Sequence, residues 1–152
     1  MTDEEYMQLA LMQAREAEKC DEVPIGAVVV CDGKVLSSAH NLRESTNDPA
    51  GHAEFIALKK AAETLGAWRL SDCVVYVTLE PCLMCAGLMH QSRIKRCVYG
   101  APDPKAGALG TLYSVHSDER LNHVFEVSAG VCQEECANLL SEFFSAKRKK
   151  KQ

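Results

Sequence analysis

Apolar positions near the start of the chain recur with the period of an amphipathic helix. Thr2 and Glu5 form a capping-box pair, which marks a helix start. Behind this pair, one helical face through about Lys19 carries the apolar residues Met7, Ala10, Leu11, Ala14 and Ala17. The pattern therefore predicts a first helix with one buried face.

The rest of the chain alternates between short apolar runs and stretches of good helix formers. Strands are expected at 25–30, 34–38, 74–79, 96–99 and 124–127, and helices at 52–65, at 82–91 and from 132 into the basic end. Asp32-Gly33 signals a hairpin turn, and Gly66 a helix end. This order, α-β-β-α-β-α-β-β-α, predicts an α/β layered domain with a hairpin at one edge of its sheet.

The last helix is expected to bury one face. That face would carry Cys132, Cys136, Leu139, Leu140 and Phe143. Polar, turn-rich loops are expected at 40–51 and 101–111, and the chain has no internal repeat.

Composition favours a single folded unit. The 152 residues are 47% hydrophobic and 25% charged, which excludes a disordered chain and a coiled-coil fibre. We expect one domain over 1–146 and a basic C-terminal tail over 147–152. The longest apolar run, 25–31, is too short to cross a bilayer, and the acidic start lacks a signal-peptide layout, so a cytoplasmic protein without a membrane partner is expected.

Charge is distributed unevenly along the chain. The net charge is −4, from 17 basic and 21 acidic residues, which is not typical of a general nucleic-acid coat. Five basic residues cluster at 147–151, so the remainder carries 12 − 21 = −9. An acidic body with a basic end can meet a polyanion near that end.

Two predicted helix starts carry side chains that ligate metals. The first start is His52-Ala53-Glu54, and the second contains Cys82 and Cys85, which share a helical face. The positive end of a helix dipole favours thiolate over thiol. Two thiolates and one imidazole suit zinc with a fourth position left for water. A carboxylate at Glu54, beside the metal rather than on it, is placed to shuttle protons.

Other interpretations of these residues remain open. Cys82 and Cys85 can form a redox dithiol pair or pack as small apolar side chains. A closed structural zinc site would need a fourth ligand, for which Cys73, Cys97 and His90 are candidates. The remaining cysteines are expected to be buried as small apolar residues.

The motif His-Ala-Glu, followed by Pro-Cys-x-x-Cys at 81–85, resembles the signature of the zinc-dependent cytidine deaminase-like superfamily. Flanking segments resemble the bacterial tRNA-specific adenosine deaminases: 22–27, 40–41, 48–49, 81–87, 92–94, 100–107 and 139–144. The resemblance covers roughly residues 5–150. It implies a three-layer α/β/α fold with a central mixed five-stranded sheet, and a homodimer.

The same resemblance implies hydrolytic deamination of the wobble adenosine of a tRNA anticodon to inosine. One Zn²⁺ per subunit on His52, Cys82 and Cys85 would activate the water that attacks carbon 6 of adenine. Glu54 would be the catalytic proton shuttle. The target base must leave its stack to reach the metal, which an anticodon stem-loop permits.

Five further residues match substrate-binding positions of the family: Asn41, Ala53, Asp103, Lys105 and Phe144. Asn41 would bind the flipped base, unless it only caps its loop, and Ala53 would contribute its backbone. Asp103 would read a 2′-hydroxyl, unless it only forms a turn between Pro102 and Pro104. Phe144 would contact RNA or a partner subunit, whereas Phe143 is expected in the core. The basic tail either meets phosphates or is a solvated end.

Two other functions are compatible with the metal motif. One is a deaminase of a free nucleobase or nucleoside, such as cytosine, guanine or adenosine. The other is a non-catalytic, zinc-stabilised tRNA-binding subunit, which would have no need of the carboxylate of Glu54.

Overall fold

The structure is a computed structural model, and it describes residues 1–150. Four α-helices and five strands follow one another in the predicted order, with one short 3-10 turn before the last strand. The elements are α1 (Asp3–Lys19), β1 (Gly26–Cys31), β2 (Lys34–His40), α2 (Ala53–Leu65), β3 (Cys73–Leu79), α3 (Leu83–Gln91), β4 (Arg96–Ala101), η1 (Val115–Ser117), β5 (Glu126–Ser128) and α4 (Gln133–Lys150).

The five strands form one mixed sheet in the order β2-β1-β3-β4-β5. β1 runs antiparallel to both β2 and β3, whereas β3, β4 and β5 are parallel. The hairpin at the β2 edge turns at Asp32 and Gly33, which both have positive φ (50° and 76°), as a tight hairpin turn requires. The predicted edge hairpin and the mixed five-stranded sheet are confirmed.

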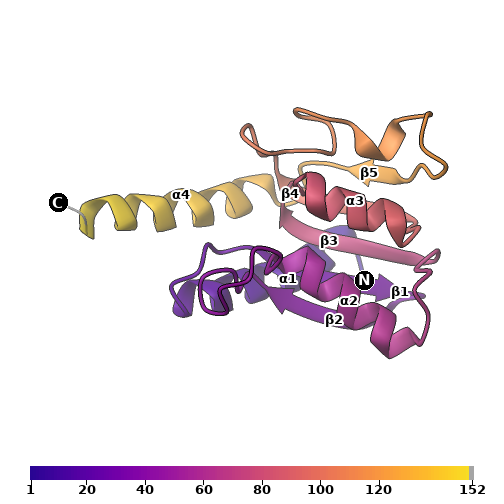
Figure 1. The fold of residues 1–152 in the computed structure, drawn as a ribbon. Coiled ribbons are helices and arrows are strands. Elements are labelled where there is room, and N and C mark those ends of the chain that lie inside the picture. Colours follow the sequence, from indigo (N-terminus) through magenta and orange to yellow (C-terminus); the bar gives the residue numbers. More distant parts are fainter. Residues whose placement is uncertain (151–152) are drawn as a thin grey trace.

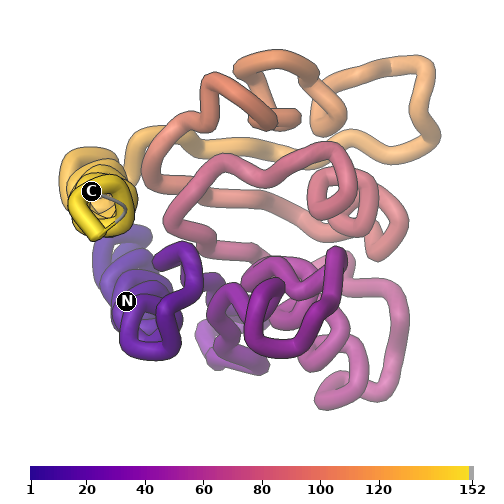
Figure 2. Tube along the Cα trace, turned by 60° about the vertical axis from the view of Figure 1, so that its left-hand side comes forward, coloured from indigo at the N-terminus to yellow at the C-terminus, as the bar shows by residue number. Residues whose placement is uncertain are grey.

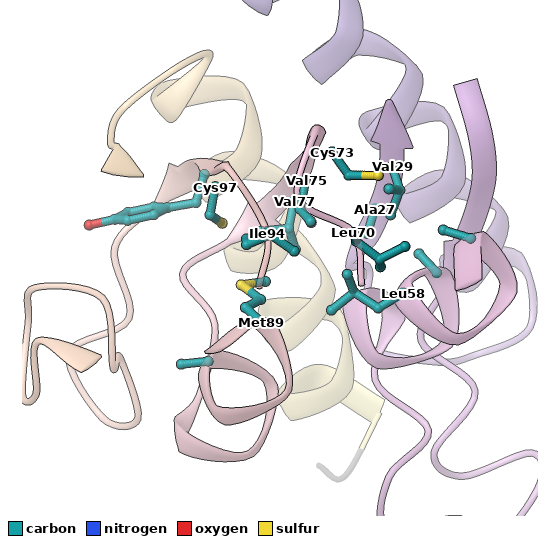
Figure 3. Packing of buried hydrophobic residues seen from close by; sticks show 14 of the residues in the cluster. Ala27, Val29, Leu58, Leu70, Cys73, Val75, Val77, Met89, Ile94 and Cys97 are labelled. Atoms are coloured by element: carbon teal, nitrogen blue, oxygen red, sulfur yellow. The ribbon is translucent and has the colours of Figure 1, made fainter. Parts of the chain in front are cut away.

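Helices cover both faces of this sheet, so the predicted three-layer α/β/α architecture is confirmed. Buried residues of α2 and α3 pack on one face, in a core that includes Val29, Leu58, Val75 and Met89 (Figure 3). Residues of α1 and the first part of α4 form a second cluster on the other face. In Figure 2 these two helices lie side by side at the left of the sheet.

Helix α1 is attached to three strands through its first turn. Thr2 and Glu5 form the predicted capping box, and Asp3 accepts hydrogen bonds from the Tyr76 hydroxyl (2.7 Å) and the Arg96 guanidinium (2.6 and 3.1 Å). Arg96 also donates to the Ser128 hydroxyl of β5. The N-terminus is thereby joined to β3, β4 and β5.

The last strand differs from its prediction. It was expected at 124–127 but spans Glu126–Ser128. The backbone N–H of Phe125 donates to His116 O (3.0 Å), and its side chain lies in the core, so the pairing with β4 starts one residue later at Glu126. Val124, which was expected in the strand, is exposed.

The expected buried face of the last helix is wrong in part. Cys132 precedes the helix and has a positive φ of 55°, Cys136 is buried, and Phe143 is only half-buried and belongs to neither core cluster. Only the first half of α4 packs on the sheet, where Gly100 lets Cys136 approach β4 closely. The second half projects from the body (Figure 1), so the apolar pattern there does not imply burial.

The basic end continues this helix. Lys147, Arg148, Lys149 and Lys150 form its last turn, whereas 151–152 of the predicted tail lie outside the described residues. The division into a domain over 1–146 and a tail stays a prediction. Within residues 1–150, no helix combines the length and apolar character needed to span a membrane.

Candidate metal centre and active site

Two of the three predicted ligands occupy equivalent positions in two helices. His52 is the N-cap residue of α2, and Cys82 is the N-cap residue of α3. N-caps are usually Ser, Thr, Asp or Asn, whose side chains accept hydrogen bonds from the first turn. Neither His52 nor Cys82 makes such a bond, so both side chains remain free to face one another.

The ligand atoms form a compact triangle. His52 Nδ1 lies 3.6 Å from Cys82 Sγ and 3.5 Å from Cys85 Sγ, and all three ligand atoms lie within 4.8 Å of one another. A tetrahedral zinc ion would separate its nitrogen and sulfur ligands by about 3.5 Å, given Zn–N and Zn–S bonds of about 2.0 and 2.3 Å. The donor set and its spacing therefore fit zinc.

This cluster contains three protein ligands. Cys73, Cys97 and His90, the sequence candidates for a fourth, do not belong to it in the part of the chain that the structure describes. Three protein ligands leave one coordination position for water or substrate, as in catalytic zinc sites. The geometry favours this arrangement over the closed structural one.

The protein environment already favours one thiolate in the cluster. Hydrogen bonding from Cys85 and then from His52 lowers the pKa of Cys82 to about 4. The Cys82 thiolate in turn raises the pKa of His52, chiefly through their hydrogen bond, and raises that of Cys85. A cation bound between them stabilises both cysteines as thiolates.

Glu54 lies beside the cluster without belonging to it. Its side chain is 4% exposed and lines the same cavity as His52 and Cys82. Burial raises the pKa of Glu54 to about 7. A carboxyl group with such a pKa can both accept and return a proton near neutral pH.

A cavity of about 250 Å³ opens over the cluster. Asn41 lines it, with Nδ2 donating to Val23 O and Oδ1 accepting from Arg43 N. Asn41 therefore caps its loop, yet an amide keeps a second donor hydrogen and a second lone pair for a ligand. Ala53 is fully buried, and its N–H is one of the donors that the first turn of α2 leaves unsatisfied.

A second cavity, of about 420 Å³, adjoins the first. Val23, Leu79 and Asp103 line both cavities. Lys105 and Phe144, the latter 43% exposed, line only the second. Four of the five substrate-binding candidates thus line the two adjoining cavities, whereas the buried side chain of Ala53 lines neither.

Asp103 also forms the turn that the alternative interpretation expected. Its Oδ1 accepts hydrogen bonds from Lys105 N (3.0 Å) and Ala106 N (3.2 Å). Within residues 1–150, the second carboxylate oxygen, Oδ2, accepts no hydrogen bond. The turn and the substrate contact are therefore compatible.

Sequence reasoning missed two buried carboxylates next to the site. Glu22 accepts hydrogen bonds from Glu44 N and from the backbone and hydroxyl groups of Ser45. Glu80 lies directly before the Pro81-Cys82 segment and binds the loop after β4. Neither role has a local sequence signal, since the partners lie more than 20 residues away.

The cysteines outside the cluster differ in burial. Cys73, Cys97 and Cys136 are buried as expected, whereas Cys31 and Cys132 are half-buried. Cys20 is exposed at the end of α1, so the expectation of burial is wrong for that residue.

Comparison with known proteins places this geometry in a family. The MafB19-like deaminase family matches residues 1–148. A Bacillus subtilis protein named tRNA-specific adenosine deaminase is 50% identical over 149 residues, which cover 98% of this chain and 92% of the relative. The chain belongs to the tRNA-specific adenosine deaminase family.

Solved structures agree with this membership. A structure from work on A-to-I editing by tRNA:A34 deaminases at the wobble position of transfer RNA has a TM-score of 0.86 and 43% identity. The match covers 90% of this chain and 99% of that one. A guanine deaminase from Bacillus subtilis shares 36% identity with a TM-score of 0.66, over 73% of this chain and 71% of the other. The family fold is thus shared with an enzyme named for a free base.

Proposed function

We propose that the protein deaminates the wobble adenosine of a tRNA anticodon to inosine, with zinc as its cofactor. The observation that carries the proposal is the group of three metal ligands beside a buried carboxyl group, in a cavity that continues into a second one. Family membership gives the substrate class.

His52, Cys82 and Cys85 would hold one zinc ion per subunit. Zinc, when bound there, acts as a Lewis acid that makes water acidic near neutral pH. The starting positions of α2 and α3 fix these ligands, since two helix N-termini meet at the cluster. The positive dipole ends of α2 and α3 favour the thiolate forms of the two cysteines over the thiols.

Glu54 would transfer the protons of the reaction. It takes a proton from the water that attacks carbon 6 of adenine, delivers one to ring nitrogen 1, and passes one to the departing amine. The carbon–nitrogen bond breaks, ammonia leaves, and inosine remains. Burial raises the pKa of Glu54, so its carboxyl group holds a proton more readily near neutral pH than an exposed glutamate does.

The flipped adenine would occupy the cavity over the metal cluster. Asn41 offers both a donor and an acceptor to a purine edge, and the backbone N–H of Ala53 offers a donor at the helix start. Ile25 and Val23 supply apolar surface for the ring. The cavity has room for a single base and not for a stack of bases, so the adenine must leave its stack before it enters.

The adjoining cavity favours an oligonucleotide over a free base. Phe144 offers an exposed aromatic ring on which a neighbouring base can stack, and Lys105 offers a cation for a phosphate. Asp103 Oδ2 can accept a hydrogen bond from a flanking 2′-hydroxyl, which DNA lacks. A free nucleobase would leave this second cavity unfilled.

We also propose a homodimer located in the cytoplasm. Apolar side chains are exposed at the start of α3 and in the loop before η1: Leu83, Met84, Leu112 and Tyr113. A second copy of the chain would remove them from water. All eight cysteines are free thiols, as a reducing compartment maintains them.

A free purine such as guanine is the second candidate substrate, because a guanine deaminase shares the fold at 36% identity. The test is one zinc-loaded preparation assayed for ammonia release from an anticodon stem-loop with a wobble adenosine, guanine, cytosine and adenosine. We expect the stem-loop to have the highest kcat/KM by orders of magnitude. Faster release from guanine would favour the second candidate.

A further inference from the structure

Glu80 is a buried carboxylate with no place in the metal cluster or in the proton transfers. It is 2% exposed and follows the last residue of β3 directly. The ligand Cys82 comes two residues later. A carboxylate is rarely buried unless its oxygens are satisfied, so its partners indicate what it does.

All the hydrogen-bond donors on this carboxylate come from one loop. Oε1 accepts from Asp103 N (3.0 Å), and Oε2 accepts from Leu109 N and Thr111 N (both 3.1 Å). The Thr111 hydroxyl also donates to the carboxylate. One side chain thus gathers donors from both ends of the segment 103–111.

The backbone around Glu80 reinforces this attachment. Glu80 N donates to Ala101 O (2.8 Å), and Ala108 N donates to Pro81 O (2.9 Å). Gly107 packs so closely that a Cβ atom there would overlap the Glu80 carboxylate. The loop that carries Asp103 and Lys105 is therefore held against the segment that carries Cys82.

This attachment fixes Asp103 relative to the metal cluster. Residues 102–107 contain no helix or strand, so the hydrogen bonds to Glu80 and the turn at Asp103 hold their shape. A displacement of the loop by a fraction of an ångström would move Asp103 Oδ2 away from any sugar hydroxyl, while the metal ligands stayed in place.

We propose that Glu80 is a positioning residue that sets the affinity for RNA and the selectivity for ribose over deoxyribose, by holding Asp103 at a fixed place beside the metal cluster. The inference rests on the proposed function, because it concerns the same substrate. Glu80 also lines the cavity over the metal cluster, but both of its carboxylate oxygens accept hydrogen bonds from the loop, so its effect on the substrate is indirect.

Glu80→Gln is the direct test. Its amide keeps one acceptor oxygen and turns an N–H group toward the donors of the loop. With a zinc-loaded protein and the RNA stem-loop, we expect KM to rise about tenfold with kcat nearly unchanged. The wild-type protein should prefer the RNA stem-loop over the same loop with deoxyribose next to the wobble position. In Glu80→Gln, the ratio of the two kcat/KM values should fall to near one. Zinc content should stay at one per chain.

A double-mutant cycle decides whether Glu80 acts through Asp103. Residues in one hydrogen-bond network are not additive, so Glu80→Gln should change kcat/KM less than about twofold in an Asp103→Ala background. The same loss in both backgrounds would overturn the proposal. Glu22→Gln is the matched control. This buried carboxylate binds a different loop, at Glu44 and Ser45, so its replacement should leave the ribose preference unchanged.

A milder variant covers the case in which Glu80→Gln folds poorly. Thr111→Val removes only one hydroxyl donor from the carboxylate and should raise KM by about two- to fivefold with the same loss of ribose preference. An unchanged preference in this variant would count against the role of Glu80. If the wild-type protein fails to deaminate the RNA stem-loop, the proposed function itself is wrong.

Discussion

His52 and Cys82 cap two different helices, and their ligand atoms face one another at 3.6 Å. Each residue sits where the chain enters a helix from an extended conformation, with φ of −83° and −79°. Two helix N-termini therefore meet at a single point, and their dipoles favour negative charge there. A cation bound between His52, Cys82 and Cys85 would add to this effect and stabilise both cysteines as thiolates.

The ligands predict a link between zinc and stability. Cys85→Ser should lose most of its zinc affinity, and with it the stabilisation that the metal provides, which is about 2.7 kcal/mol when free zinc is 100 times its Kd. Zinc content and melting temperature measured with and without a chelator check this. Cys20→Ser, an exposed cysteine outside the site, serves as the control and should match wild type. Full zinc content in Cys85→Ser would remove that residue from the ligand set.

Glu54 predicts a different phenotype from that of the ligands. Glu54→Gln keeps the shape of the side chain but cannot carry a proton between water and substrate. We expect one zinc ion per chain and a loss of turnover of about 100-fold or more. Metal analysis and single-turnover rates measure the two properties separately. Loss of zinc from this variant would show that Glu54 is a ligand instead.

The metal cluster could be predicted from the sequence because its residues are closely spaced within two short segments. His52 and Glu54 share one helix start, Cys82 and Cys85 share another, and only the meeting of these two starts depends on the fold. The hydrogen bonds of Glu80 depend on a loop that is folded back over more than 20 residues. Burial of a carboxylate by such a loop leaves no periodic or spaced pattern in the sequence.

Asp3 and Arg96 predict a pH-dependent part of the stability. Hydrogen bonds from Arg96, and then from Tyr76, hold the pKa of Asp3 below its usual range despite partial burial. A lowered folded-state pKa stabilises the fold above the unfolded pKa of about 4, and this stabilisation is lost as pH falls through the folded value.

Asp3→Asn should therefore destabilise the protein by about 1 kcal/mol at pH 7, and the difference from wild type should shrink below about pH 4. Denaturant unfolding at several pH values measures this difference. Glu16, in an exposed ion pair with Lys19, provides the comparison, and Glu16→Gln should change little at any pH. An Asp3→Asn effect that grows on acidification would contradict this interpretation.

The basic end of α4 predicts a salt-dependent contact with RNA. Lys147 forms an ion pair with Asp21 (2.6 Å) and lies over the Phe143 ring, so the free cations for RNA are expected at 148–150. Replacing Arg148, Lys149 and Lys150 by alanine should flatten the log–log salt dependence of RNA binding by about 0.7 to 0.9 per lost contact. An unchanged slope would show a solvated helix end, and zinc content serves as the folding control.

The second half of α4 shows why an apolar pattern is an incomplete guide to burial. Phe143 and Leu140 continue the period set by Cys136, yet the sheet ends before they reach it. Leu140 instead lines the second cavity, and Phe143 contacts Lys147. The pattern identifies the helix correctly, but only the tertiary fold determines what that face meets.

The position of the product tests the account most directly. An unmodified anticodon stem-loop with adenosine at the wobble position and at a second place in the loop is incubated with the zinc-loaded protein, and inosine is mapped by nuclease digestion and mass spectrometry. We predict inosine at the wobble position, one ammonia released per inosine, and neither product with Glu54→Gln. Ammonia released from free guanine, cytosine or adenosine with no inosine in the RNA would contradict the account.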